Sequence, residues 1–286
     1  MSAADQLLVV IDPVARRIDG ESVRIAKDVL CAGAQAKICW PEGVEEFSRA
    51  LARRGGRRPV VVGDDRTLLR TVTLLQRDRG GLGAGSDAAS DAASDAASAP
   101  ALSLVPVGTA RSVEIARSLG VPMGAVAAAR AVLDGVPRRL DLLVDESGGV
   151  VLGDLCIPAP MRVAAPTVWG TCRSLVRTLV RAPVALPVAA AVAHRLRVEA
   201  DGVLLSDLDL PVAGVSVGSG DGVAHVVIQP RVGAVVRVRA RVVTVSVVGD
   251  GFRYRAGVVV GGPVRSRTWT AGSWTLTLPS PTPPVP

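Results

Sequence analysis

Aromatic residues, histidine and lysine are all scarce in this chain of 286 residues. Only 2% of the residues are aromatic, and Lys27 and Lys37 are the only lysines. A platform that stacks the bases of nucleic acid needs more aromatic side chains, so no nucleic-acid partner is expected. His194 and His225 stand apart from any carboxylate or Ser motif, and we expect no catalytic histidine. The core must therefore be built from Val, Leu and Ala.

Paired cysteines and long apolar runs are also lacking. The four cysteines form no CxxC pair and have no histidine nearby, which indicates reduced, mostly buried thiols rather than disulfides or a zinc site. The longest apolar run, residues 182–194, contains two prolines and is too short to span a bilayer. The first residues do not resemble a secretory signal. We expect a soluble, cytoplasmic protein without a transmembrane segment; a peripheral position at the membrane is the alternative.

Basic residues are in excess, and nearly all of them are arginine, with a formal net charge of +7 at pH 7. Such an excess suits anionic partners such as phosphates or acidic headgroups, although an Arg-rich coding bias produces the same excess. No GxxxxGK[ST] sequence occurs, which excludes a P-loop nucleotide site.

Strand and helix patterns alternate through the first half of the chain. Apolar runs predict strands over residues 7–12, 36–41, 58–64 and 101–108, and amphipathic stretches predict helices over residues 21–33, 43–56, 66–81, 111–120 and 123–135. Between them, residues 82–100 repeat SDAA three times, which favours an exposed linker or loop insertion over a short polar helix.

Beyond about residue 136 the helical pattern fades, and Val-rich alternating stretches broken by Gly and Pro follow. We therefore predict an N-terminal Rossmann-like α/β domain (residues 1–136), a β-sandwich domain (residues 137–279) and a disordered Pro-rich tail (residues 280–286).

The stretch RRPVVVGDDRTLLRTV, residues 57–72, places a predicted strand end directly before a predicted helix. Ends of this kind bind phosphate in α/β proteins, usually through glycine and backbone N–H groups. Here Asp64, Asp65 and Arg66 follow Gly63. Two interpretations stay open: a structural turn with a local Asp–Arg pair, or an altered anion or nucleotide site. A left-handed backbone at Asp64 or Arg66 would cost about 1–2 kcal/mol each.

The layout and several motifs resemble the bacterial diacylglycerol kinase and lipid kinase family, whose nucleotide domain is related to NAD kinases. The resemblance runs from about Leu7 to Leu278. The family sequence Gly-Gly-Asp-Gly-Thr corresponds to residues 63–67, and Pro-x-Gly-Thr corresponds to PVGT at residues 106–109. A later family motif, Leu-Gly-Ile-Pro, corresponds to LGVP at residues 119–122.

The resemblance implies ATP-dependent phosphorylation of a lipid hydroxyl in the cleft between the two domains. It assigns the nucleotide to Gly63, Asp64, Asp65, Arg66, Thr67, Gly108 and Thr109, and Mg²⁺ to Asp65, Glu114 and Asp141. Glu114 can also be read as a solvated helix residue, and Asp141 as the structural partner of Arg138 or Arg139. The implied partner is a lipid substrate or an anionic membrane surface, and a homodimer is left open.

Departures from the family pattern affect the chemistry. Its Asp-Gly-Glu motif, whose Glu is the expected base, reads Ala256, Gly257, Val258 here. General-base catalysis is worth about 10²–10⁴-fold, so we expect a slow or altered kinase with an unknown base. The alternative is a non-catalytic relative that binds nucleotide or anionic lipid.

The alternating stretch VVRVRARV places Arg237, Arg239 and Arg241 on one strand face, either solvated or in contact with lipid headgroups.

Overall fold

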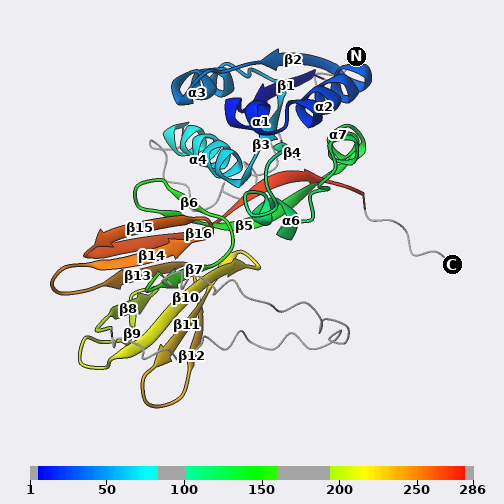
Figure 1. Cartoon of the computed structure of the whole chain (residues 1–286). Coiled ribbons are helices and arrows are strands. Elements are labelled where there is room, and N and C mark those ends of the chain that lie inside the picture. The colour runs from blue at the N-terminus through cyan, green and yellow to red at the C-terminus, as the bar shows by residue number, and fades with distance from the viewer. Residues whose placement is uncertain (1–5, 83–100, 160–193, 281–286) are drawn as a thin grey trace, which may run out of the picture.

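The computed structural model describes residues 6–82, 101–159 and 194–280, which form an α/β part and a β part (Figure 1). Most of the predicted linker, Cys172 and nearly all of the predicted tail lie outside the described residues.

The described cysteines form no disulfide, and Cys31 is exposed while Cys39 and Cys156 are partly buried. The prediction of mostly buried thiols is therefore wrong for Cys31.

A four-stranded parallel sheet forms the centre of the α/β part, with strand order β2-β1-β3-β4. Its strands are β1 (Gln6–Ile11), β2 (Gln35–Cys39), β3 (Arg58–Gly63) and β4 (Ser103–Pro106). The apolar runs predicted all four, because a parallel sheet covered on both faces buries nearly every side chain of its central strands. The carboxyl ends of the four strands meet at one edge.

Helices cover both faces of this sheet (Figure 1). They are α1 (Pro13–Ile18), α2 (Gly20–Gly33), α3 (Val44–Ala52), α4 (Asp65–Leu82), α6 (Glu114–Ser118) and α7 (Ala125–Asp134). Val23 of α2 and Ala128 of α7 share one buried cluster with Val9, whereas Phe47 of α3 and Leu68 of α4 pack on the other face. None of the described helices is both long and apolar enough to cross a membrane.

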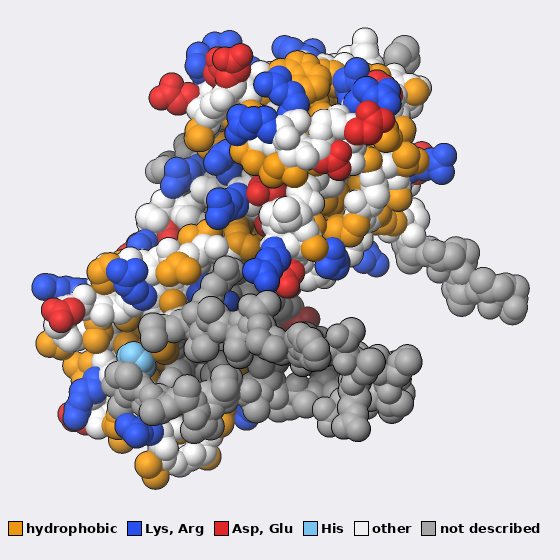
Figure 2. Space-filling model, viewed as in Figure 1, with side chains coloured by type: hydrophobic (Ala, Val, Ile, Leu, Met, Phe, Trp, Pro, Cys, Tyr) orange, Lys and Arg blue, Asp and Glu red, His pale blue; other side chains and the backbone are white. Residues whose placement is uncertain are grey.

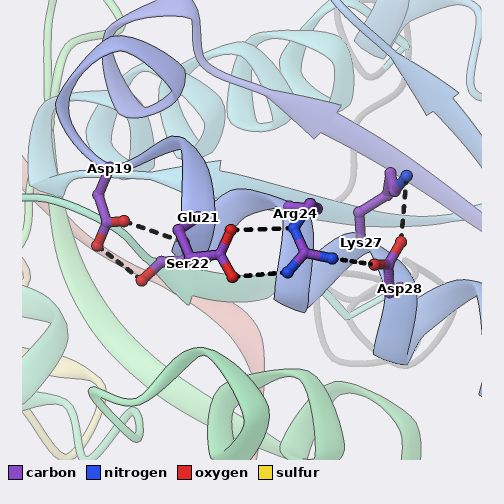
Figure 3. A network of polar contacts seen from close by, with 6 residues as sticks. All are labelled: Asp19, Glu21, Ser22, Arg24, Lys27 and Asp28. Carbon is purple, nitrogen blue, oxygen red and sulfur yellow. Dashed lines mark hydrogen bonds and ion pairs between the residues drawn. The ribbon is translucent and has the colours of Figure 1, made fainter.

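An exposed polar network runs along α2 (Figure 3). The Asp19 carboxylate accepts hydrogen bonds from the Ser22 N–H at 3.0 Å and the Ser22 hydroxyl at 2.6 Å, which together lower the pKa of Asp19. Arg24 then lies 2.6 Å from Glu21 and 3.4 Å from Asp28. Because exposed ion pairs contribute little, the cap and the buried face stabilise α2.

Two six-stranded antiparallel sheets make up the β part, with orders β12-β11-β10-β7-β14-β15 and β6-β5-β16-β13-β8-β9. Residues of both sheets, including Val217, Tyr254 and Trp269, form the buried cluster between them, which confirms the predicted sandwich. The strands are β5 (Val136–Asp145), β6 (Val150–Val151), β7 (Leu155–Ile157), β8 (Arg197–Ala200), β9 (Val203–Ser206), β10 (Val212–Gly220), β11 (Val223–Pro230), β12 (Val236–Ala240), β13 (Val242–Ser246), β14 (Phe252–Ala256), β15 (Val259–Val264) and β16 (Ser266–Leu278).

The long strand β16 connects the two parts. It pairs with β5 along all of β5, and Leu102, just before β4, exchanges backbone hydrogen bonds of 3.0 and 2.8 Å with Thr275 and Thr277. Trp274 and Leu276 of β16 join the same buried cluster as α3 and α4. This shared core fixes the β part against the helices; the predicted division at residue 136 stays a prediction.

Candidate functional site

The carboxyl edge of the parallel sheet brings together the residues predicted to bind nucleotide. Gly63 ends β3 and residues 64–67 open α4, while Gly108 and Thr109 follow β4. The Val107 N–H donates to the Gly63 carbonyl at 2.9 Å. A Cβ atom on Gly108 would lie 3.5 Å from Cβ of Asp64, so the two loops are in contact. This edge is where α/β folds usually bind ligands.

Asp64 caps the first turn of α4 with its own side chain. Its Oδ1 accepts hydrogen bonds from the N–H groups of Arg66 at 3.1 Å and Thr67 at 3.0 Å, and from the Thr67 hydroxyl at 3.1 Å. Its carbonyl accepts the first helical hydrogen bond, from the Leu68 N–H, at 2.9 Å. Asp64 is therefore the N-cap residue, and its carboxylate occupies N–H groups that a bound phosphate would use.

The backbone of this turn is unstrained. Within the described residues, Asp201 and Asp221 are the only non-glycine residues with positive φ, so Asp64 and Arg66 avoid the left-handed conformation whose cost we considered. The side chain of Arg66 forms no ion pair with Asp64 among the described contacts; the two residues meet through the Arg66 N–H. In the interpretation of this stretch as a structural turn, the Asp–Arg side-chain pair is thus replaced by a helix cap.

Asp65 holds the start of a second helix, α6. Its side chain is 1% exposed, and its two carboxylate oxygens accept hydrogen bonds from the N–H groups of Ile115 at 2.8 Å and Ala116 at 2.9 Å. The Asp65 N–H in turn donates to the Ser112 carbonyl at 2.8 Å. Burial raises the pKa of Asp65 despite the opposing effect of these hydrogen bonds. Val113, the N-cap residue of α6, supplies no side-chain cap, so Asp65 takes that role.

The three residues assigned to Mg²⁺ do not form one group. Glu114, the exposed first residue of α6, directly precedes the donors that bind Asp65. Asp141 instead lies on β5, opposite Ser273, and accepts a 3.1 Å hydrogen bond from the Gly222 N–H. Among the described ion pairs, none joins Asp141 to Arg138 or Arg139. In the described part of the chain, no cluster of three or more His, Cys, Asp or Glu side chains could hold a metal ion.

The turn that carries Val258 faces α6. A Cβ on Gly257 would lie 3.3 Å from Cδ1 of Ile115, and Val258 packs against the core shared by the two parts. The Gly257 N–H donates to the Asp154 carbonyl at 3.2 Å. The exposed Asp154 therefore places a carboxylate-bearing residue beside a turn whose residues Gly257 and Val258 carry none.

Two features of this edge were not predicted from the sequence. The first is the set of backbone donors at the start of α6, which only the folded chain brings to Asp65. The second is Trp40, directly after β2, which is 44% exposed and lies with its ring 5.9 Å from the guanidinium carbon of Arg16. An isolated Trp next to last in the predicted strand over residues 36–41 was a signal that could have identified it.

No protein family model and no curated protein matches the sequence. The fold does match solved structures from Bacillus anthracis strain Sterne. A diacylglycerol kinase is 14% identical with a TM-score of 0.66, over 97% of this chain and 98% of that one. A proposed diacylglycerol kinase is 13% identical with a TM-score of 0.67, over 97% and 96%. The resemblance expected from the motifs is thus confirmed in the fold: the chain has the two-part architecture of these diacylglycerol kinases.

Proposed function

We propose that this chain is a non-catalytic relative of the diacylglycerol kinases whose fold it shares, and that it binds anionic lipid rather than ATP. The observation that carries the proposal is the position of the Asp64 carboxylate, which occupies the N–H groups of Arg66 and Thr67 at the start of α4. A helix N-terminus attracts phosphate through unoccupied N–H groups and the positive end of the helix dipole. Here the Asp64 carboxylate already accepts from the N–H groups and already lies at the positive end of the α4 dipole.

Electrostatics opposes a second anion at this position. A phosphate charge about 4 Å from the Asp64 carboxylate would cost about 4 kcal/mol at an effective dielectric near 20. Moving Asp64 away instead removes a helix cap worth about 1 kcal/mol. A bridging Mg²⁺ would reduce the repulsion, but the three carboxylates nominated for Mg²⁺ do not converge. Val258 also cannot accept a proton from a lipid hydroxyl.

The second candidate is a slow or altered lipid kinase that uses ATP and Mg²⁺. Its support is the exposed Arg66 at the start of α4, together with Gly108 and Thr109 on the adjacent loop. In this candidate Arg66 pairs with a phosphate after Asp64 moves away, and Asp65 and Glu114 contribute to binding Mg²⁺. The residue that accepts the proton stays unassigned.

Calorimetric titration with ATP, with and without Mg²⁺, separates the two candidates. The variants are Asp64→Gly, which empties the start of α4, and Asp19→Gly as a matched control, because Asp19 caps α2 in the same manner. We expect no binding by the wild type at millimolar ATP, a gain of about fivefold in affinity for Asp64→Gly, which no longer has a carboxylate to move aside, and no gain for Asp19→Gly.

Micromolar, Mg²⁺-dependent ATP binding by the wild type, with transfer of phosphate to a lipid, would overturn the proposal in favour of the slow kinase. No gain for Asp64→Gly would show that Asp64 is not what excludes the nucleotide. Binding of the wild type to vesicles containing anionic lipid, unaffected by ATP, tests the second half of the proposal.

A further inference from the structure

Two neighbouring loops at one end of the β part expose large apolar side chains. Residues 207–211 connect β9 to β10, and residues 231–235 connect β11 to β12. The Arg231 N–H donates to the Pro211 carbonyl at 3.1 Å, so the loops lie side by side. Leu210 is 63% and Val232 is 92% exposed. We call this pair of loops the tip surface.

The position of the tip surface leaves it accessible to a binding partner. The β11–β12 loop projects from the end of the β part that is remote from the helices (Figure 1). Val235, in the same loop, is a further exposed apolar residue, at 40%. Figure 2 shows apolar side chains at this lower end of the molecule, between basic ones. Apolar side chains gathered on a loop tip mark a binding surface more often than scattered ones do.

Arginine side chains surround the two apolar loops. Arg195 is held beside the first loop by a 3.3 Å hydrogen bond from its Nη1 to the Leu208 carbonyl. Arg231 and Arg237 are exposed in and directly after the second loop, and neither forms an ion pair with the described residues. The carboxylates of these loops are Asp209, which is exposed, and Asp207, which lies 3.8 Å from Arg197, so the three arginines still outnumber the acidic side chains.

The strand that follows the second loop also bears on the charge distribution. Arg239 is exposed and lies 3.4 Å from Asp221, at the opposite end of β12 from the tip surface. Arg241 lies outside β12, and its N–H donates to both oxygens of Asp201 at 2.9 and 3.1 Å. The predicted face of three arginines therefore reduces to Arg237 and Arg239, of which Arg237 lies at the tip surface.

We propose that the tip surface docks the protein onto an anionic membrane, with Leu210 and Val232 entering the headgroup region and Arg195, Arg231 and Arg237 contacting lipid phosphates. The inference rests on the proposed lipid binding and adds the surface that performs it. Apolar residues at a tip, bordered by guanidinium groups, match the two attractions that an anionic bilayer offers: burial at the acyl boundary and a negative surface potential.

The test is co-sedimentation with vesicles of phosphatidylcholine alone and of phosphatidylcholine mixed with phosphatidylglycerol. One variant, Leu210→Ser/Val232→Ser, removes the apolar tip, and a second, Arg195→Gln/Arg231→Gln/Arg237→Gln, removes the charge. The matched controls are Val259→Ser/Val260→Ser on the exposed edge strand β15 and Arg17→Gln/Arg53→Gln/Arg130→Gln on the α/β part. Thermal melting verifies that every variant folds.

We expect binding only to the mixed vesicles. The charge variant should lose about a hundredfold in affinity, from roughly tenfold or less per arginine, and the apolar variant at least about tenfold. The controls should stay within about twofold of the wild type. High salt should weaken the wild type but change the charge variant little.

Three results would overturn the docking surface, and they differ in what they mean for lipid binding itself. Wild-type affinity in both tip variants would place the lipid contact elsewhere and leave the proposed function intact. No wild-type binding to mixed vesicles would end both proposals. Light scattering provides a further check: if the wild type is a dimer and Leu210→Ser/Val232→Ser is a monomer, the tip surface binds a second copy of the chain, and membrane docking is wrong.

Discussion

Oδ1 of Asp65 lies 2.9 Å from the backbone nitrogen of Ala116, and Oδ2 makes the adjacent contact with Ile115 at 2.8 Å. These hydrogen bonds join the first residue of α4 to the start of α6, so one buried carboxylate ties two helix starts together. The same acidic residue was expected to help bind Mg²⁺. Its geometry describes a structural cap, and a bound cation would have to share oxygens that two N–H groups already use.

Replacing Asp65 with Ala should destabilise the protein by about 2–5 kcal/mol, because two buried N–H groups lose their acceptor. Asp65→Asn should cost less, since its amide oxygen can still accept from one of them. Chemical denaturation measures both. Asp28→Ala, on the exposed face of α2, is the control and should change the free energy of unfolding by no more than about 0.5 kcal/mol. Equal stability of Asp65→Ala and the wild type would show that α6 does not depend on this contact.

The raised pKa of Asp65 also predicts a pH dependence. Burial favours the neutral form, so the folded chain binds this proton more tightly than the unfolded chain, whose Asp titrates near 3.8. The part of the stability that comes from this tighter proton binding is therefore fully present below pH 3.8 and is lost as the pH rises through the folded-state pKa.

The measurement is the difference in free energy of unfolding between the wild type and Asp65→Asn across the acid range. The two chains share every other carboxylate, so the effects of titrating those carboxylates cancel in this difference. We expect this difference to shift against the wild type as the pH rises above 3.8 and then to level off. A shift in favour of the wild type would mean that the hydrogen bonds from Ile115 and Ala116 outweigh burial and lower the pKa.

The cap formed by Asp64 predicts a graded series of stabilities. Asp64→Ser should stay close to the wild type because a hydroxyl also accepts from the N–H groups of Arg66 and Thr67, whereas Asp64→Ala should lose about 1 kcal/mol. Asp64→Gly should lose only a few tenths of a kcal/mol. Thermal unfolding of the three variants checks the order, and a loss for Asp64→Ser as large as for Asp64→Ala would contradict the cap.

The alternation of strands and helices was predictable because a buried parallel strand leaves an uninterrupted apolar run. LLVVI over β1 and PVVVG over β3 are such runs. The short helix α1 was missed: six residues of PVARRI carry too little periodicity to distinguish a helix from a turn. Helix α6 is shorter than predicted: the pattern covered residues 111–120, and only residues 114–118 are helical.

The candidate site was predictable in its location but not in its contacts. Gly63 at the end of one strand and PVGT at the end of the next indicated one sheet edge, since parallel strands end together. The role of Asp65 depends on partners 50 and 51 residues away, which no local pattern contains. The cap by Asp64 was predictable, because Asp directly before a helix is a common N-cap, but the resemblance assigned the same residue to a nucleotide site.

The junction between the two parts gives the last prediction. Gly135 follows α7 and precedes β5, and a Cβ there would lie 2.2 Å from the carbonyl oxygen of Ala131 and 2.5 Å from that of Leu278. Both are backbone atoms of packed elements, so they cannot move aside as a flexible side chain could. Gly135→Ala should therefore destabilise the chain by about 1–3 kcal/mol or more.

Gly124, before α7, is the matched control because a Cβ there would meet nothing within 4 Å and its φ of −86° suits any residue. Denaturant titration followed by Trp fluorescence should therefore separate the two alanine variants clearly. Trp274 lies in the core that both parts share, so loss of packing at Gly135 should change its emission together with the stability. If Gly135→Ala were as stable as Gly124→Ala, then α7 and β16 would have room to separate, and the shared core would not hold the two parts rigidly together.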